Sequence, residues 1–206
     1  MKILTIDIDY ISGQSFELLH LLYNLREMPD HTRNKFYWER IVQDSGVIER
    51  YLEPNLHNVR FINQIFYKAL RMGCNNVVFG YHHDSILNHI SDEARDIILV
   101  NIDHHHDLSR TANGEYEAFR LGYYAEYNWV LKLERQINTY TWIKNPNSAL
   151  FKGGELPYDY LVCEKEDKEV VGLINDIDGW DLIYVCLSPH QTPPKQWHYF
   201  WLMKES

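Results

Sequence analysis

The sequence predicts an α/β protein, a three-layer αβα fold around a mostly parallel sheet. Short β-branched or apolar runs alternate along the chain with segments of helical periodicity, as in proteins built from parallel strands and crossover helices. Apolar residues make up 45% and charged residues 24% of the 206 positions, which is the composition of an ordinary globular chain. No linker, internal repeat or low-complexity segment divides it. We therefore expect a single domain over residues 1–206.

The individual elements follow from hydrophobic periodicity and end signals. Six short apolar runs are predicted to be strands: residues 3–8, 76–80, 97–102, 139–143, 160–163 and 182–187. Apolar residues at helical spacing predict helices over residues 15–25, 33–43, 59–72, 116–133 and 168–175, with a short helix within 84–93. Ser15 is a plausible cap of the first helix, and Gly73 closes the third.

Charge, hydropathy and cysteine content exclude several classes. Net charge is −9, so the field of the molecule repels nucleic-acid phosphate. The apolar runs are far shorter than the roughly 20 residues that cross a bilayer. Two aspartates within the first nine residues interrupt any signal-peptide core, and we expect a cytoplasmic protein. Cys74, Cys163 and Cys186 are odd in number and far apart, which suits buried reduced thiols without chemistry.

Polar clusters follow three of the predicted strands. Asp7 and Asp9 end the first strand, His82 and His83 follow the second, and the segment Asp-His-His-His-Asp at 103–107 follows the third. In open α/β sheets, ligands bind outside the carboxyl ends of the strands. The three clusters are therefore expected to converge on one crevice.

The donor types predict a metal centre. In an extended chain, Asp103, His105 and Asp107 share one face, while the intervening histidines point away. Oxygen and nitrogen donors without thiolate suit manganese, iron or zinc, and four carboxylates exceed what one tetrahedral zinc requires. Two cations about 3.5–4 Å apart, with a bridging hydroxide as nucleophile, would use them all. The candidate ligands are Asp7, Asp9, His83, Asp103, His105 and Asp107. An Asp-x-Asp pair alone is more typical of a cap or a loop, so the prediction depends on the clusters together.

These segments resemble a known superfamily. The segment at 103–107 resembles the Asp-x-His-x-Asp signature of the arginase and histone-deacetylase superfamily, and residues 77–85 resemble its strand followed by Gly-Gly-Asp-His-Ser. The Asp-x-Asp motif, which arginases carry late in the chain, stands here at positions 7–9, so the motif order is rearranged. Together with the segment Leu-Ser-Pro-His-Gln-Thr-Pro-Pro at 187–194, the pattern is most similar to the peptide arginases of ribosomal natural-product pathways.

The resemblance implies an arginase-like catalytic domain with two Mn²⁺ ions. One ion would be held by His83, Asp103, Asp107 and Asp7, and the other by His105, Asp103, Asp7 and Asp9. It further implies that a hydroxide between the metals would attack the guanidinium carbon of an arginine in a peptide, namely a ribosomal precursor peptide, releasing urea and leaving ornithine.

Two parts of the arginase pattern do not carry over. The segment 108–114, where arginases hold the ends of free arginine, contains Arg110 but no equivalent set, which fits a peptide substrate. The carboxylate that orients the guanidinium is not identified by the motifs: Glu126, Glu164 and another acid are the alternatives. His190 is a candidate proton shuttle. Ordinary loop or surface placement is the competing interpretation for each of them.

Other enzyme classes fit part of the pattern. Asp-His-His at 103–105 also resembles the motif of the DHH phosphoesterases, which use an upstream Asp-x-Asp and two Mn ions, although their usual second domain has no room here. The Asp-x-Asp motif at 7–9 also resembles that of haloacid-dehalogenase-type phosphatases, but an enzyme of this class would leave the histidine cluster without a role. A single-zinc deacylase of the arginase and deacetylase superfamily would leave His83 spare, and an inactive binding module is a further alternative.

Aromatic residues are frequent, with 15 Tyr and six Trp. The segments 123–129 and 197–201 are candidates for the lining of a peptide groove. They would equally serve as core or as oligomer contacts.

Overall fold

A computed structural model of the chain describes residues 1–12, 53–108, 129–148, 150, 155–168, 170, 172, 175, 179–189 and 192–206. The helices predicted over residues 15–25 and 33–43 lie outside the described residues, as does most of the one predicted over 116–133. Within 168–175, the described residues are helical.

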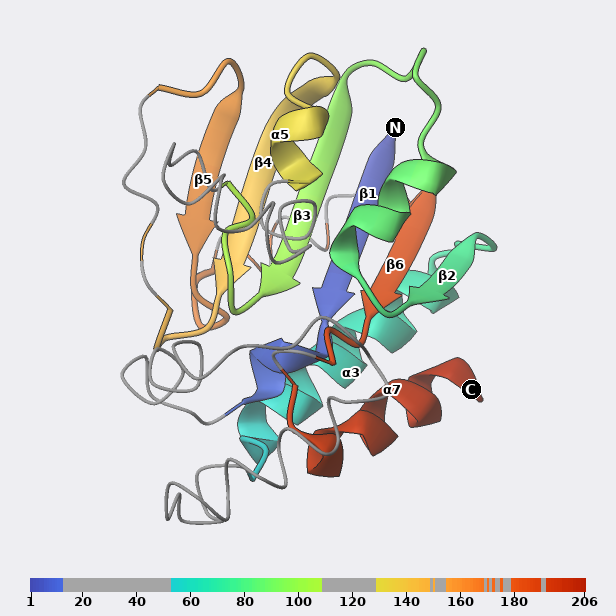
Figure 1. Ribbon diagram of the computed structural model, residues 1–206, viewed down its shortest axis with the longest axis vertical. Coiled ribbons are helices and arrows are strands. Elements are labelled where there is room, and N and C mark those ends of the chain that lie inside the picture. The colour runs from blue at the N-terminus through green and yellow to red at the C-terminus, as the bar shows by residue number, and fades with distance from the viewer. Residues whose placement is uncertain are drawn as a thin grey trace, which may run out of the picture.

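The core of the structure is a six-stranded parallel sheet (Figure 1). Its strands are β1 (Lys2–Asp7), β2 (Val77–Gly80), β3 (Ile97–Asp103), β4 (Ile137–Lys144), β5 (Asp159–Cys163) and β6 (Leu182–Cys186). They lie in the order β2-β6-β1-β3-β4-β5, and every neighbouring pair is parallel. The six predicted strands are confirmed with small shifts at their ends. The arrowheads all lie at one edge of the sheet, so the carboxyl ends of the strands are gathered there.

The central strands are buried on both faces. All residues of β6 are buried, and so are five of the six in β1. Alternate residues enter different cores: Leu4 and Ile6 pack on one side of the sheet, and Ile3 packs on the other. Strands covered on both faces read as continuous apolar runs, which is why these segments are recognisable in the sequence. The arrangement is consistent with three layers.

Helices cover both faces of the sheet. Helix α3 (Leu56–Arg71) begins at Asn55, whose side chain accepts from the backbone N–H groups of residues 57 and 58, and ends before Gly73 at φ 93°. With α7 (Trp197–Lys204) it packs on the Leu4 and Ile6 side. The short helix α5 (Trp129–Lys132) and the 3-10 helix η3 (His83–His89) pack on the other side. No helix within the described ranges is long and apolar enough to cross a membrane.

The strand order places a switch point beside β1. After β1 the chain builds β2 on one side of it, and then returns to build β3 on the other side. The connections on the two sides of such a point diverge, and this leaves a crevice at the carboxyl ends of the strands. The 3-10 helix η1 (Ile8–Ile11) leaves β1 directly at this edge, and a last 3-10 turn, η4 (Pro194–Gln196), precedes α7.

Candidate metal centre

The six predicted ligand residues lie together at the switch point. Asp7 and Asp103 are the last residues of β1 and β3, His83 is the first residue of η3 after β2, and Asp9 lies in η1. His105 and Asp107 follow β3. All are buried except His105, which is partly exposed.

The end of β1 turns two successive acidic side chains into the site. Asp7 caps η1, because its Oδ1 accepts the backbone N–H of Asp9 at 2.9 Å. The 3-10 turn then carries Asp9 over the end of β3, where its Oδ1 accepts the backbone N–H of His104 at 3.2 Å. Because of this turn, both carboxylates of the Asp-x-Asp motif point into the site.

The end of β3 differs from the extended segment expected over 103–107, and that expectation was wrong. The strand stops at Asp103, and its Oδ1 accepts the N–H of His105 at 2.8 Å within a bend. Asp107 has φ 52°, in the left-handed region. The three side chains thus converge through a turn and not through strand alternation. His106 packs its ring edge-on against Trp142, with centroids 5.8 Å apart.

Gly80 and Tyr184 set the position of His83. The Tyr184 hydroxyl donates to the carbonyl of His82 at 2.5 Å, directly before His83. A Cβ at Gly80 would lie 1.9 Å from that hydroxyl oxygen, so only glycine leaves room for the phenol over the end of β2. The turn after β2 is therefore fixed by β6.

The ligand residues form two groups that share Asp103. In the first, His83 Nδ1 lies 3.4 Å from Asp7 Oδ2, 3.2 Å from Asp103 Oδ2 and 3.0 Å from Asp107 Oδ2. We call these four residues the inner group.

In the second, the outer group, His105 Nδ1 lies 2.9 Å from Asp9 Oδ2 and 3.8 Å from Asp103 Oδ1. Asp103 thus offers one oxygen to each group. Asp7, by contrast, faces the inner group through Oδ2, while its Oδ1 accepts from the backbone.

Several residues that sequence reasoning missed hold the ligands in place. The Trp129 indole donates to Asp107 Oδ2, and the Trp142 indole donates to the Asp103 carbonyl at 3.0 Å. The Asn101 amide donates to Asp103 Oδ2 at 3.2 Å. Asn101 lies two residues before Asp103, hence on the same face of β3, and this polar residue in a buried strand was the available signal.

The end of β6 also reaches the inner group. The Ser188 hydroxyl donates to Asp7 Oδ2, and the Cys186 Sγ lies 3.2 Å from Ser188 Oγ. Sequence reasoning had assigned no role to either residue, because nothing in the sequence shows that β6 lies beside β1.

Burial and crowding shift the pKa values of the carboxyl groups. Burial and the charge of Asp9 raise the pKa of Asp7 to about 7. Burial and the charges of neighbouring carboxylates, Asp107 first, raise the pKa of Asp103 well above its usual value. Burial alone would also raise the pKa of Asp9, but the hydrogen bond and charge of His105 outweigh it and hold that pKa at about 2.

The histidines divide into two kinds. Burial would lower the pKa of His83, but the charges of Asp7 and Asp107 outweigh it and raise that pKa to about 9. The pKa of His105 is raised in the same way by Asp9, against burial. Burial and the charge of His105 lower the pKa of His104 to about 4, and burial likewise lowers the pKa of His106 to about 4. Of these four histidines, only His83 and His105 therefore carry positive charge that compensates the negative charge of the carboxylates.

The donor set fits divalent cations. Four aspartates, each no more than 4% exposed, face two imidazoles, so positive charge is deficient even when both rings are protonated. Within the described part of the chain, only His83 and His105 form ion pairs with them. The Nε2 of His83 is buried and has no hydrogen-bond partner among the described residues. Three overlapping sets of donor atoms, each within 4.8 Å, have the spacing of metal sites: Asp7, His83 and Cys186; Asp9, Asp103 and His105; His83, Asp103 and Asp107.

Of the other predicted site residues, Glu164 is the one that lies within the described part of the chain. Glu126, His190 and Arg110 lie outside the described residues. Glu164 forms an ion pair with Lys144, with Nζ and Oε1 2.7 Å apart.

The aromatic segments proved to be partly core. Trp129 and Phe200 are buried, whereas Trp201 is 38% exposed, and residues 123–128 lie outside the described residues. Trp129 and Phe200 therefore cannot line an open groove.

Comparisons with known proteins returned no match, whether with family models, with curated proteins or with solved structures.

Proposed function

We propose that this protein is a hydrolase that uses two divalent cations, Mn²⁺ in the first place, to convert arginine side chains in a peptide to ornithine with release of urea. The observation that carries the proposal is the pair of donor groups that share the two oxygens of Asp103. Carboxylates that bridge in this way are typical of two-metal hydrolytic sites.

The residues that would hold the cations follow from the two groups. His83, Asp7, Asp107 and Asp103 would hold the inner cation, and His105, Asp9 and Asp103 would hold the outer one. When bound, the two cations supply a water molecule of lowered pKa and stabilise negative charge at the reacting carbon.

The chain's own residues account for binding and access. The His83 side chain is 4% exposed, so the inner group is closed to a substrate, whereas the His105 side chain is 30% exposed. A guanidinium group would therefore approach over the outer group, where the imidazole is the more exposed of the two. In the overall reaction water adds to the guanidinium carbon, its bond to the side-chain nitrogen breaks, and that nitrogen leaves as a protonated amine.

The choice of peptidyl arginine rests on the resemblance of the segments 6–12 and 187–194 to peptide arginases, within the superfamily that the segments 77–85 and 103–107 resemble. The net charge of −9 supports a basic peptide as partner. Precursor peptides of ribosomal natural products are the substrate class that the resemblance favours.

Mass spectrometry tests the reaction directly. The Mn-loaded protein is incubated with an arginine-containing peptide and, separately, with free arginine. We expect the peptide alone to lose one CH2N2 unit per arginine processed, with urea as co-product, and Asp103→Asn to abolish the loss. Unchanged peptide and unchanged free arginine, with two metals bound, would exclude arginase activity.

A two-metal phosphoesterase is the second candidate, because the Asp-x-Asp motif at the end of β1 precedes the Asp-His-His motif at the end of the neighbouring strand β3, as in the DHH enzymes. The same preparation is therefore assayed with an aryl phosphodiester and with an acetyl-lysine peptide. Release of phenol would favour the phosphoesterase, and release of acetate the deacylase.

A further inference from the structure

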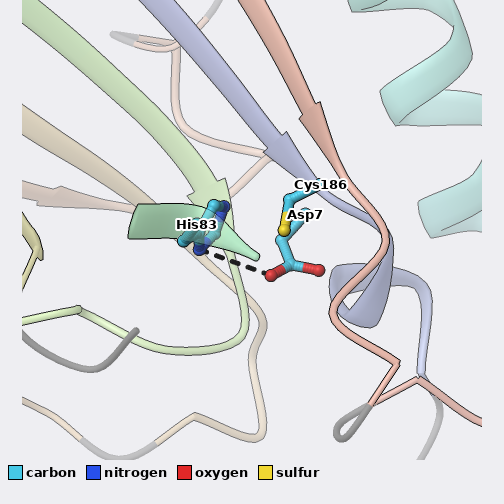
Figure 2. A group of neighbouring side chains, drawn as sticks. All are labelled: Asp7, His83 and Cys186. Atoms are coloured by element: carbon cyan, nitrogen blue, oxygen red, sulfur yellow. Dashed lines mark ion pairs between the residues drawn. The ribbon is translucent and has the colours of Figure 1, made fainter. Parts of the chain in front are cut away.

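Cys186 lies at the edge of the inner group. It is the last residue of β6, and in the parallel ladder it stands opposite Asp7 of β1 and Gly80 of β2. Opposite residues of paired strands share a face of the sheet, so the thiol and the Asp7 carboxylate extend to the same side. Figure 2 shows Cys186, Asp7 and His83 around one point, with the ion pair between His83 and Asp7.

The surroundings of this thiol are those of a ligand. Donor atoms of Cys186, Asp7 and His83 all lie within 4.8 Å of one another. Cys186 is fully buried, and its sulfur lies 3.2 Å from Ser188 Oγ, which itself donates to Asp7.

A second observation comes from His83. It is 3% exposed, and its Nε2 has no hydrogen-bond partner among the described residues. Its other ring nitrogen, Nδ1, lies 3.4, 3.2 and 3.0 Å from carboxylate oxygens of Asp7, Asp103 and Asp107, a crowding of buried carboxylates that a bound ion would neutralise.

We propose that Cys186 binds the inner cation as a thiolate. The inference rests on the metal centre of the proposed function but not on its substrate. On binding, the S–H bond breaks, the sulfur–metal bond forms and the proton passes to solvent.

The consequence is that the two cation positions differ in chemistry. The inner position gains a soft sulfur donor, whereas the outer position keeps one imidazole and carboxylates. Thiolate favours zinc, cobalt or iron over manganese, and carboxylate suits manganese. The inner position therefore selects a softer metal than the outer one.

The other cysteines provide matched controls. Cys74 and Cys163 are buried and free like Cys186, but they belong to the core on the other side of the sheet. Cys74 Sγ donates to the Asn76 carbonyl at 3.5 Å. Among the described residues, neither belongs to a set of three metal donors.

Cobalt substitution tests the proposal. The full chain is loaded with Co²⁺, and its near-ultraviolet spectrum is recorded together with the metal content of wild type, Cys186→Ser and Cys74→Ser. We expect a thiolate-to-cobalt charge-transfer band in wild type and in Cys74→Ser, and its loss in Cys186→Ser. We also expect the zinc affinity of Cys186→Ser to fall by at least about tenfold while manganese affinity changes less.

A wild-type chain that binds two cobalt ions without this band, or a band that persists in Cys186→Ser, would overturn the proposal. If Cys186→Ser does not fold, X-ray absorption of the wild-type zinc protein decides whether sulfur binds the metal. A sulfur scatterer about 2.3 Å from zinc supports the ligand, and a shell of only oxygen and nitrogen refutes it. Since neither readout requires turnover, a protein with the sulfur ligand but no arginine hydrolysis would refute the proposed substrate alone.

Discussion

The inner and outer groups of the candidate metal centre are built from the same residue types but differ in access to solvent. The inner imidazole is enclosed by aromatic rings: the His83 ring centroid lies 5.6 Å from that of Trp129 and 6.4 Å from that of Tyr184. The outer imidazole, His105, lies in a bend after β3 and is partly exposed. An enclosed group can hold an ion firmly, and an open group can admit substrate and water. The inner position is therefore suited to holding an ion, and the outer position is suited to contact with substrate and water.

The shared residue should produce the largest effect. Asp103→Asn keeps the shape of the side chain but removes the charge that faces both groups. We expect binding of both cations to fall by more than about 100-fold, beyond the range typical of residues outside the ligand shell. Metal content after dialysis measures it, with the exposed Asp92→Asn as control. Retention of two ions would show that Asp103 does not join the groups.

Removing one imidazole from each group should separate them. In metal-free protein, His83→Ala leaves three buried carboxylates without their partner and should cost about 3 kcal/mol of unfolding free energy. His105→Ala lies at a partly exposed position and should cost about 1 kcal/mol. Urea unfolding in the presence of EDTA measures both. Equal losses would contradict the distinction between inner and outer groups.

The inner group should also control how stability depends on pH in metal-free protein. The pKa of His83 is raised from 6.5 to about 9 by Asp7 and Asp107, against burial. The folded state therefore keeps a proton that the unfolded chain releases, and the unfolding free energy falls as pH rises from 6.5 to about 9.

The measurement is urea unfolding in EDTA at both ends of this range. His83→Gln should flatten the pH dependence. A His105→Gln variant that flattens it more than His83→Gln would reverse the assignment.

A smaller effect on metal binding than that of Asp103→Asn is expected from a residue that supports the inner group. Trp129→Phe keeps the aromatic ring but removes the hydrogen bond to Asp107. We expect inner-cation affinity to fall about 10-fold to 100-fold, as for other residues that orient ligands. Trp180→Phe is the control, since that buried indole nitrogen has no hydrogen-bond partner in the described part of the chain. Competition with a chelating dye gives both affinities, and equal changes would exclude an orienting role for Trp129.

The sequence was sufficient for the strands and for the choice of ligand candidates. Buried parallel strands leave continuous apolar runs, and acidic and histidine clusters at their ends mark the edge where they meet. The register between strands that are far apart in the sequence could not be predicted, because no local pattern indicates that Cys186 of β6 lies opposite Asp7 of β1. Local turns were also misjudged, since the left-handed conformation of Asp107 has no signal comparable to a glycine. The sequence therefore predicted which acidic and histidine residues the structure brings together, but not the residues that hold them in place.

The position of β6 between β1 and β2 determines the order in which the site can assemble. In the sheet, β2 hydrogen-bonds to β6, and β6 in turn to β1. While the chain is being synthesised, β1 and β3 are available to pair once residue 103 has been made, but β2 has no place beside them until residues 182–186 have followed. His83 is thus the last of the candidate ligands to be fixed, although it precedes three of the others in the sequence. A nascent chain would carry a half-formed set of donors, and the proposed cation sites would be complete only once the sheet is.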